Sequence, residues 1–135
     1  MKKLLPLFIL TILISSAYSQ QTTLSFCAGI DNERCAFNNT KFITSPDSTI
    51  AKIFMMVAGD NELPLGSTKL VYKIYQLDKT GAETMINTIE QNIEANWIYA
   101  WQSAFFYTPG KYTVKVYSDT NRLLNNKSFE LIDKL

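Results

Sequence analysis

Apolar and polar residues alternate along most of the chain after residue 20, and short polar stretches interrupt the alternation. Side chains that alternate with a period of two are typical of strands that bury one face. The alternation predicts strands over 22–27, 41–44, 49–58, 68–77, 83–89, 96–107, 111–118 and 123–132. Strands at a spacing of roughly 8–12 residues indicate a β-sandwich or a small barrel.

Turn residues separate the predicted strands. The interruptions are rich in the Gly, Pro, Asp and Asn that tight turns prefer. The clearest are Ser45-Pro46-Asp47, Gly59–Gly66, Asp78–Gly81, Thr108-Pro109-Gly110 and Asp119-Thr120-Asn121. Residues 88–96 are ambiguous, because their pattern fits one helical turn as well as a loop. No repeat or linker interrupts the pattern, so residues 20–135 are predicted to form a single all-β domain.

The N-terminal residues have a different pattern. Two lysines precede a continuous apolar run, Leu4–Ile14, and Ala17 and Ser19 place small residues where a signal peptidase cleaves. The run is shorter than the roughly 20 residues that a membrane-spanning helix needs. Residues 1–19 are therefore predicted to be a cleaved signal peptide of bacterial type. The domain is expected to be exported to the periplasm, the cell surface or the medium.

A lipoprotein signal is a second interpretation of this region, because Leu24-Ser25-Phe26-Cys27 resembles a lipobox, in which the cysteine is acylated. However, Phe26 stands where that motif requires a small residue. The polar stretch Gln20–Thr23 also lies where the apolar run should continue. Ordinary cleavage near Ser19 is the better interpretation.

Both cysteines of the chain, Cys27 and Cys35, remain after this cleavage. In an oxidising compartment such a close pair is most simply a disulfide that closes a short loop. Gly29, Asp31 and Asn32 supply the turn that this loop requires. Two free thiols are the alternative. A zinc site would be incomplete, because the chain has no histidine.

Composition argues against several classes of function. Lys and Arg number 13 while Asp and Glu number 12, so the basic excess that nucleic-acid binding needs is missing. Without histidine, a serine or cysteine nucleophile lacks its usual base. Glu90 and Glu94 would share a face in a helix, but exposed glutamates on a connection are far commoner than a hydrolytic pair. We therefore predict that the protein is not an enzyme and needs no cofactor.

Two acidic turns, Asp31-Asn32-Glu33 and Asp60-Asn61-Glu62, could each offer oxygen atoms to calcium. Neither has the ligand number or the spacing of a known calcium loop. Polar turn chemistry explains both, and no metal site is predicted.

The segment Pro109-Gly110-Lys111-Tyr112-Thr113-Val114 resembles the start of the penultimate strand in immunoglobulin-like and fibronectin type III-like sandwiches. In those folds a tyrosine at this place donates a hydrogen bond to upstream backbone, a role that the resemblance implies for Tyr112. Val114 stands where antibody domains have a cysteine, and Tyr72 where they have a buried tryptophan. The resemblance implies an antiparallel immunoglobulin-like β-sandwich of about seven or eight strands, and no particular function.

The segment 96–107 is the most aromatic part of the chain, and Trp97, Tyr99 and Trp101 share one face of the predicted strand. These rings could form a stacking platform for sugars, or they could fill the core. The other face of this strand is apolar as well. The pattern therefore leaves open whether the rings are buried or exposed.

A second candidate surface follows from the resemblance, because in an immunoglobulin-like order the strand 68–77 lies beside the strand 111–118. Their outer faces carry Lys69, Lys73, Tyr75, Lys115 and Tyr117. Such a lattice could bind an acidic protein partner or an anionic or sugar-like polymer. It also has the composition of an ordinary solvated strand face.

Together these features favour an exported, non-enzymatic binding module. The first prediction is recognition of a protein partner at or near the cell surface, through the lysine–tyrosine face or the aromatic strand. The alternative is a carbohydrate-binding module that uses the exposed aromatic residues of 97–101. Neither nucleic-acid binding nor a membrane span is expected for residues 20–135.

Overall fold

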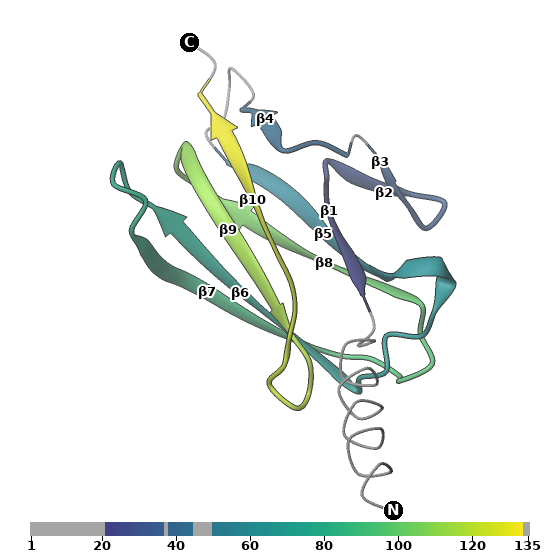
Figure 1. The fold of residues 1–135 in the computed structure, drawn as a ribbon. Helices are drawn as coiled ribbons and strands as arrows, with labels where there is room; N and C mark the ends of the chain where they lie inside the picture. Colours follow the sequence, from purple (N-terminus) through teal and green to yellow (C-terminus); the bar gives the residue numbers. More distant parts are fainter. Residues whose placement is uncertain (1–20, 37, 45–49, 134–135) are drawn as a thin grey trace, which may run out of the picture.

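The alternating segments form strands that pair into two facing sheets (Figure 1). The structure is a computed structural model that describes residues 21–36, 38–44 and 50–133. The predicted signal peptide, residues 1–19, lies outside the described residues, and so does the predicted turn Ser45-Pro46-Asp47.

The described residues form strands and turns, with one 3-10 turn (η1, Asp60–Glu62) and no α-helix. The strands are β1 (Thr22–Cys27), β2 (Gly29–Asp31), β3 (Arg34–Ala36), β4 (Lys41–Ile43), β5 (Ala51–Gly59), β6 (Lys69–Leu77), β7 (Glu83–Asn92), β8 (Tyr99–Phe106), β9 (Gly110–Tyr117) and β10 (Leu123–Ile132). The described residues form ten strands rather than seven or eight, because β2 and β3 have three residues each and are too short to show a period. Strand β4 is equally short but lies within the predicted strand 41–44.

The smaller sheet has the order β1-β5-β8 and the larger one the order β4-β10-β9-β6-β7, while β2 and β3 form a separate hairpin. Nearly every pair is antiparallel, as expected. The exception is β4, which lies parallel to the end of β10. The ambiguous segment 88–96 is extended up to Asn92, because β7 pairs with β6 along its whole length. Glu90 therefore lies opposite Val71 and not on a helical face with Glu94.

An aromatic cluster joins the two sheets. Its centre is Phe129 of β10, whose ring centroid lies 4.8 Å from that of Phe26, 5.0 Å from Phe106 and 5.4 Å from Tyr112. The four side chains are at most 2% exposed. Buried aromatic residues contribute a large apolar area, and each ring pair adds about 0.5–1.5 kcal/mol to it. This cluster anchors the strands that carry the candidate sites.

Two tyrosines, Tyr112 and Tyr72, lie in the core at the positions that the resemblance implies. The hydroxyl of Tyr112 donates a hydrogen bond to the carbonyl oxygen of Thr108, which is the contact that the resemblance implies. Tyr72 is fully buried, and desolvation raises the pKa of its hydroxyl. That hydroxyl donates to Gln91 Oε1 at 2.8 Å, and Gln91 Nε2 donates to the carbonyl oxygen of Trp101 at 3.0 Å. Gln91 thus ties the larger sheet to β8 of the smaller one.

Candidate functional site

A pocket of about 630 Å³ opens beside the start of β8. Its volume lies within the range of small-molecule sites. The lining comes from three parts of the chain: the tip of the β2–β3 hairpin, the end of β7, and the start of β8 together with the residues that lead into it. The lining residues are Glu33, Gln91, Asn96, Trp97, Ile98, Tyr99, Ala100 and Trp101.

The aromatic residues of this pocket lie at the surface and not in the core. Trp97 is 39% exposed, whereas Tyr99 and Trp101 are partly exposed. The Tyr99 and Trp101 rings are nearly parallel, with an interplanar angle of 10° and centroids 6.0 Å apart. They share this orientation because residues two apart on a strand point to the same side. The structure brings together the three aromatic residues that the sequence singled out.

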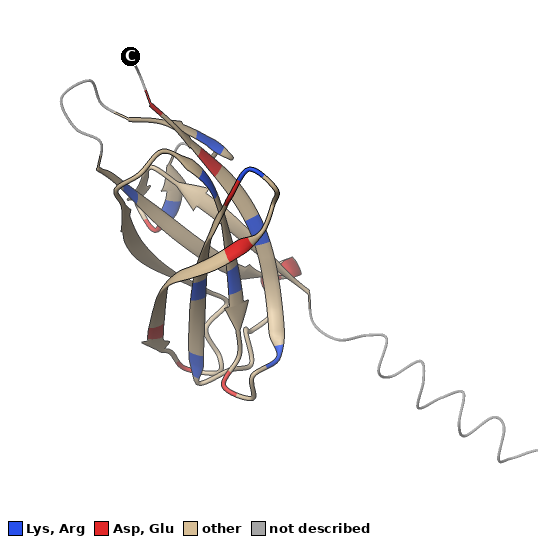
Figure 2. Ribbon diagram, turned by 90° about the vertical axis from the view of Figure 1, so that its left-hand side faces the viewer, with Lys and Arg blue, Asp and Glu red and all other residues tan. Residues whose placement is uncertain are grey.

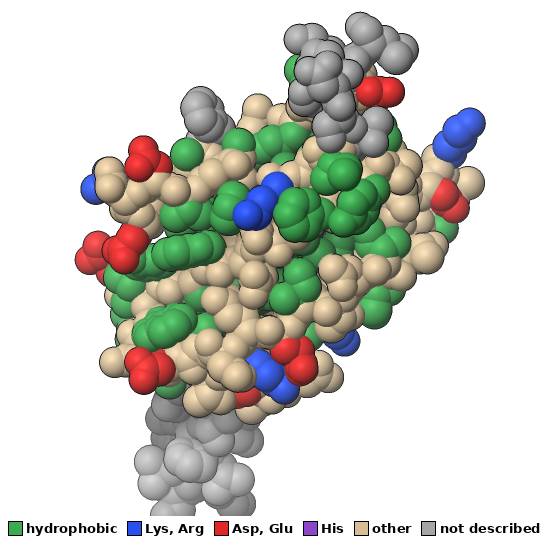
Figure 3. All heavy atoms as spheres, turned by 180° about the vertical axis from the view of Figure 1, so that it is seen from behind, with side chains coloured by type: hydrophobic (Ala, Val, Ile, Leu, Met, Phe, Trp, Pro, Cys, Tyr) green, Lys and Arg blue, Asp and Glu red, His purple; other side chains and the backbone are tan. Residues whose placement is uncertain are grey.

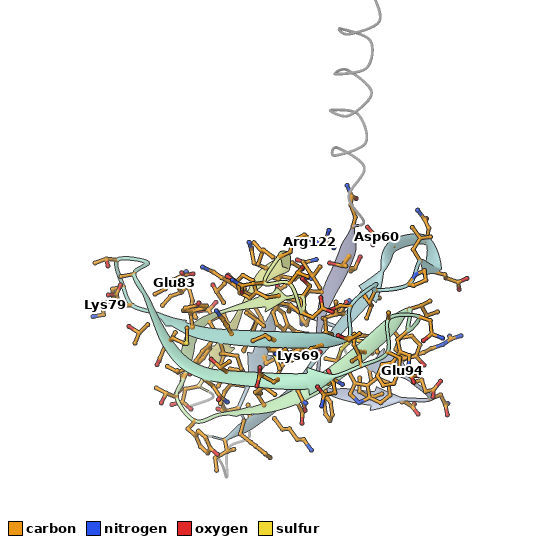
Figure 4. All side chains as sticks on the ribbon, turned by 90° about the horizontal axis from the view of Figure 1, so that it is seen from below. Asp60, Lys69, Lys79, Glu83, Glu94 and Arg122 are labelled. Carbon is orange, nitrogen blue, oxygen red and sulfur yellow. A yellow bond between two sulfur atoms is a disulfide. The ribbon has the colours of Figure 1, made fainter. Side chains whose placement is uncertain are left out.

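Trp97 is held by its neighbours on both sides. Its indole Nε1 donates to Glu94 Oε2 at 3.1 Å, and its backbone N–H donates to the carbonyl oxygen of Glu94 at 3.0 Å. The carbonyl oxygen of Trp97 accepts a hydrogen bond from the N–H of Leu65 at 2.7 Å. Figure 4 shows Glu94 and Asp60 at one end of the molecule and Glu83 at the other. The hydrogen bond to Glu94 therefore orients the Trp97 ring, which lines the pocket.

The β2–β3 hairpin supplies the opposite wall of the pocket, and the predicted Cys27–Cys35 disulfide is present. This bridge fastens β3 to the end of β1, with the two Cα atoms 5.4 Å apart. The turn at the hairpin tip has positive φ at both Asn32 (48°) and Glu33 (61°). A two-residue turn of this geometry usually has glycine in the second place. Here that place holds a glutamate whose side chain reaches the pocket.

Glu33 connects the hairpin to the aromatic strand. Its Oε2 accepts a hydrogen bond from the hydroxyl of Tyr99 at 2.8 Å, across 66 positions of sequence. This bond to the carboxylate raises the pKa of the Tyr99 hydroxyl. Among the described lining residues Glu33 is the sole charged side chain, and Gln91 and Asn96 are the polar neutral ones. The pocket is therefore aromatic, with an acidic side chain and no basic one.

The backbone of β8 faces this site with its free edge. Gly59 N–H donates to the carbonyl oxygen of Ile98, so the neighbouring residues Tyr99 and Trp101 direct their backbone groups away from β5. Side-chain amides occupy part of that edge. Gln91 donates to the Trp101 carbonyl oxygen, and Ser103 N–H donates to Gln102 Oε1 at 3.1 Å.

The lysine–tyrosine face also forms as the sequence predicts, since β6 pairs with β9 and Lys73 lies opposite Lys115. The Lys73 ammonium lies 4.7 Å from the centroid of the Tyr117 ring, and Lys115 lies at the same distance from Tyr75. Figure 2 shows basic residues along the strands of this sheet, with acidic residues among them.

Two ion pairs balance the charge of this face. Lys115 Nζ lies 2.9 Å from Glu83 Oε1, and Lys69 Nζ lies 3.1 Å from Glu90 Oε1. The hydrogen bond to Glu83 raises the pKa of Lys115. Most charged side chains of the lysine–tyrosine face thus already interact with residues of their own sheet.

The outer side of the smaller sheet extends beyond the pocket as an apolar surface. Figure 3 shows hydrophobic side chains gathered over the back of the molecule, with acidic side chains along its left-hand rim. Phe105 is 54% exposed and Tyr107 63% exposed. Lys52 lies across two rings of this surface, with Nζ 5.1 Å from the centroid of Phe54 and 5.7 Å from that of Phe105.

Sequence reasoning did not place Glu33, Gln91 and Asn96 in a site. The sequence indicates that Asp31-Asn32-Glu33 is a polar turn, and only the predicted disulfide indicates that this turn folds back toward β1. Within the residues that the structure describes, no group of three or more His, Cys, Asp or Glu side chains is arranged to hold a metal ion. No helix in those residues is both long and apolar enough to cross a membrane.

Comparison with known proteins concerns the fold. No protein-family model matches the chain, and no curated protein resembles it in sequence. An immunoglobulin-like protein from Pseudomonas aeruginosa is similar in structure, with a TM-score of 0.55 and 15% identity. The match covers 84% of this chain and 96% of that one. The architecture is immunoglobulin-like.

Two further solved structures are similar to this immunoglobulin-like sandwich at lower scores. A Niemann-Pick type C2 protein from the Japanese carpenter ant has a TM-score of 0.48 and 6% identity, over 85% of this chain and 92% of that one. A superoxide reductase from Ignicoccus hospitalis has a TM-score of 0.47 and 9% identity, over 90% and 86%. Nothing about the function of this chain follows from such distant likenesses.

Proposed function

We propose that the protein is an exported, non-enzymatic carbohydrate-binding module, in which an immunoglobulin-like sandwich follows a cleaved signal peptide, residues 1–19. The observation that supports this function best is the pocket beside β8, where Trp97, Tyr99 and Trp101 lie around a cavity of about 630 Å³. A sugar ring has an apolar face of C–H groups and a rim of hydroxyls. The pocket offers surfaces for both.

The aromatic rings would hold the apolar face of a sugar. The face of an aromatic ring carries partial negative charge, which attracts the slightly positive C–H hydrogens. Around the rings, the Glu33 carboxylate can accept hydrogen bonds from hydroxyls, and the Asn96 amide can both accept and donate them. Because the Glu94 carboxylate already orients the Trp97 indole, binding would cost little ordering of that side chain.

Calorimetric titration with a panel of oligosaccharides, together with tryptophan fluorescence, tests this function. We expect at least one sugar to bind, and binding to weaken at least tenfold in Trp97→Ala and in Trp101→Ala. Tyr107→Ala is the matched control, because Tyr107 is an exposed ring outside the pocket. Silence across the panel, with unchanged fluorescence, would rule out the carbohydrate function.

Recognition of a protein partner at or near the cell surface is the second candidate. The observation in its favour is the apolar surface beyond the pocket, where Phe105 and Tyr107 are more than half exposed. If this surface binds a partner, Phe105→Ser/Tyr107→Ser should abolish capture of a native binding protein. If the lysine–tyrosine face is used instead, Lys73→Glu/Lys115→Glu should do so. Capture that survives both double exchanges would exclude both surfaces.

A further inference from the structure

We infer that the pocket beside β8 selects sugars that carry a protonated amine, such as hexosamine units without an acetyl group. This inference rests on the proposed carbohydrate-binding function and adds the charge of the ligand. The first observation is the charge of the lining itself. Glu33 is acidic and no described lining residue is basic, while a second carboxylate, Glu94, accepts a hydrogen bond from the indole of the lining residue Trp97.

Glu33 retains capacity for a ligand. Its Oε2 accepts the hydroxyl of Tyr99, whereas its Oε1 makes no hydrogen bond with any residue that the structure describes. A carboxylate can accept several hydrogen bonds, and those from an ammonium group are stronger than those from a neutral hydroxyl. The site would therefore hold an amine more tightly than the hydroxyl found at the same ring position of glucose.

The aromatic rings support the same preference. Elsewhere in the described residues, four outward-facing rings lie under lysines of the chain, whereas Tyr107 does not: Lys73 over Tyr117, Lys115 over Tyr75, and Lys52 over Phe54 and Phe105. No lysine that the structure describes makes such a contact with Trp97, Tyr99 or Trp101. Tryptophan is the strongest aromatic acceptor of a cation. Within the pocket, all three aromatic rings are thus open to a cation from outside the chain.

The position of Glu33 is fixed by the chain and does not depend on the ligand. The left-handed turn at Asn32 and Glu33 sets its direction, and the disulfide at Cys35 holds the hairpin against β1. The chain also contains a natural comparison. Asp60-Asn61-Glu62 repeats the same three residue types with the same positive φ at Asn61 and Glu62, but Glu62 does not line the pocket.

The test uses three oligosaccharides with the same β-1,4-linked pyranose backbone, composed of glucosamine, N-acetylglucosamine or glucose. They differ at one ring position, which carries an ammonium, an acetamide or a hydroxyl group. Titration calorimetry is done on the full exported chain at about pH 6, where side-chain carboxylates are normally ionised and the sugar amine is protonated. We expect the glucosamine oligomer to bind about tenfold more tightly than the other two.

Two variants assign that preference to Glu33. Glu33→Gln keeps an oxygen that can accept the Tyr99 hydroxyl but removes the charge, so it should erase the tenfold preference by weakening binding of the glucosamine oligomer to the level of the other two. Glu62→Gln removes a charge from the twin turn and should leave the preference intact. Equal affinity for the three oligomers, or a preference that survives Glu33→Gln, would overturn this inference and leave the proposed function standing. If none of the three binds, and no sugar of the wider panel binds, the proposed function itself is wrong.

Discussion

Removal of the Cys27–Cys35 disulfide is expected to release the β2–β3 hairpin while the two sheets stay folded. The bridge spans a sequence separation of 8. In the chain-entropy model, a loop of this length is worth about 2.5 kcal/mol at 25 °C. For a domain of this size, that loss corresponds to a fall in Tm of roughly 10 °C. The hairpin depends on the bridge because β2 and β3 pair with each other and with neither sheet.

The assay compares the wild-type chain with Cys27→Ala/Cys35→Ala. Calorimetry gives the Tm, and hydrogen exchange reports the protection of the amides in residues 29–36. These amides should lose protection, whereas those of β5 and β9 should keep it, because both strands pair on both sides. Wild-type protein that has been reduced and alkylated is the control and should behave like the variant. If the amides of residues 29–36 stay as protected as in the oxidised wild type, both in the variant and in the reduced, alkylated protein, the bridge does not hold the hairpin.

Three further predictions concern stability, measured by urea unfolding. Phe129→Ala should cost about 3–5 kcal/mol, because it empties the centre of the aromatic cluster; a loss under about 1 kcal/mol would contradict that role. Tyr112→Phe should cost about 1–2 kcal/mol, since the Thr108 carbonyl loses its partner. Hydrogen bonds from Thr68 lower the pKa of the Asp119 carboxyl below its ordinary value of 3.8. The free energy of unfolding should therefore fall as the pH drops below 3.8, and this fall should be less steep in Asp119→Asn than in the wild type.

Strand β6 shows how much of this fold can be predicted from the sequence. Leu70, Tyr72 and Ile74 are buried, while Lys69 and Lys73 between and beside them are partly exposed. The alternation is clear because one face packs on the core and the other meets water. The resemblance to immunoglobulin-like sandwiches correctly placed β6 beside β9, and the contact of Tyr112 was expected from a local motif.

Strand β8 shows where the prediction stops. Its two faces are both apolar, so the period alone could not say which one is buried. In the structure Ala100, Ala104 and Phe106 are buried, whereas Tyr99 and Trp101 lie on the outer face. The outer rings are partly covered by contacts made far away in sequence, above all the one from Glu33. No local pattern encodes a hydrogen bond across 66 positions, and the left-handed turn that aims it has no glycine to reveal it.

The free edge of β8 explains why the pocket suits a small ligand better than another strand. An exposed edge normally invites pairing with a further strand, and proteins block such edges. Here side-chain amides occupy the hydrogen-bonding positions that a further strand would use. Gln91 donates to the Trp101 carbonyl oxygen, and Gln102 accepts from the Ser103 N–H. A strand added at this edge would have to displace both amides, and moving Gln91 would also leave the buried Tyr72 hydroxyl without its partner. Leaving a buried hydroxyl unpaired costs about 1–3 kcal/mol, whereas a sugar seated against the rings beside the edge needs no such loss.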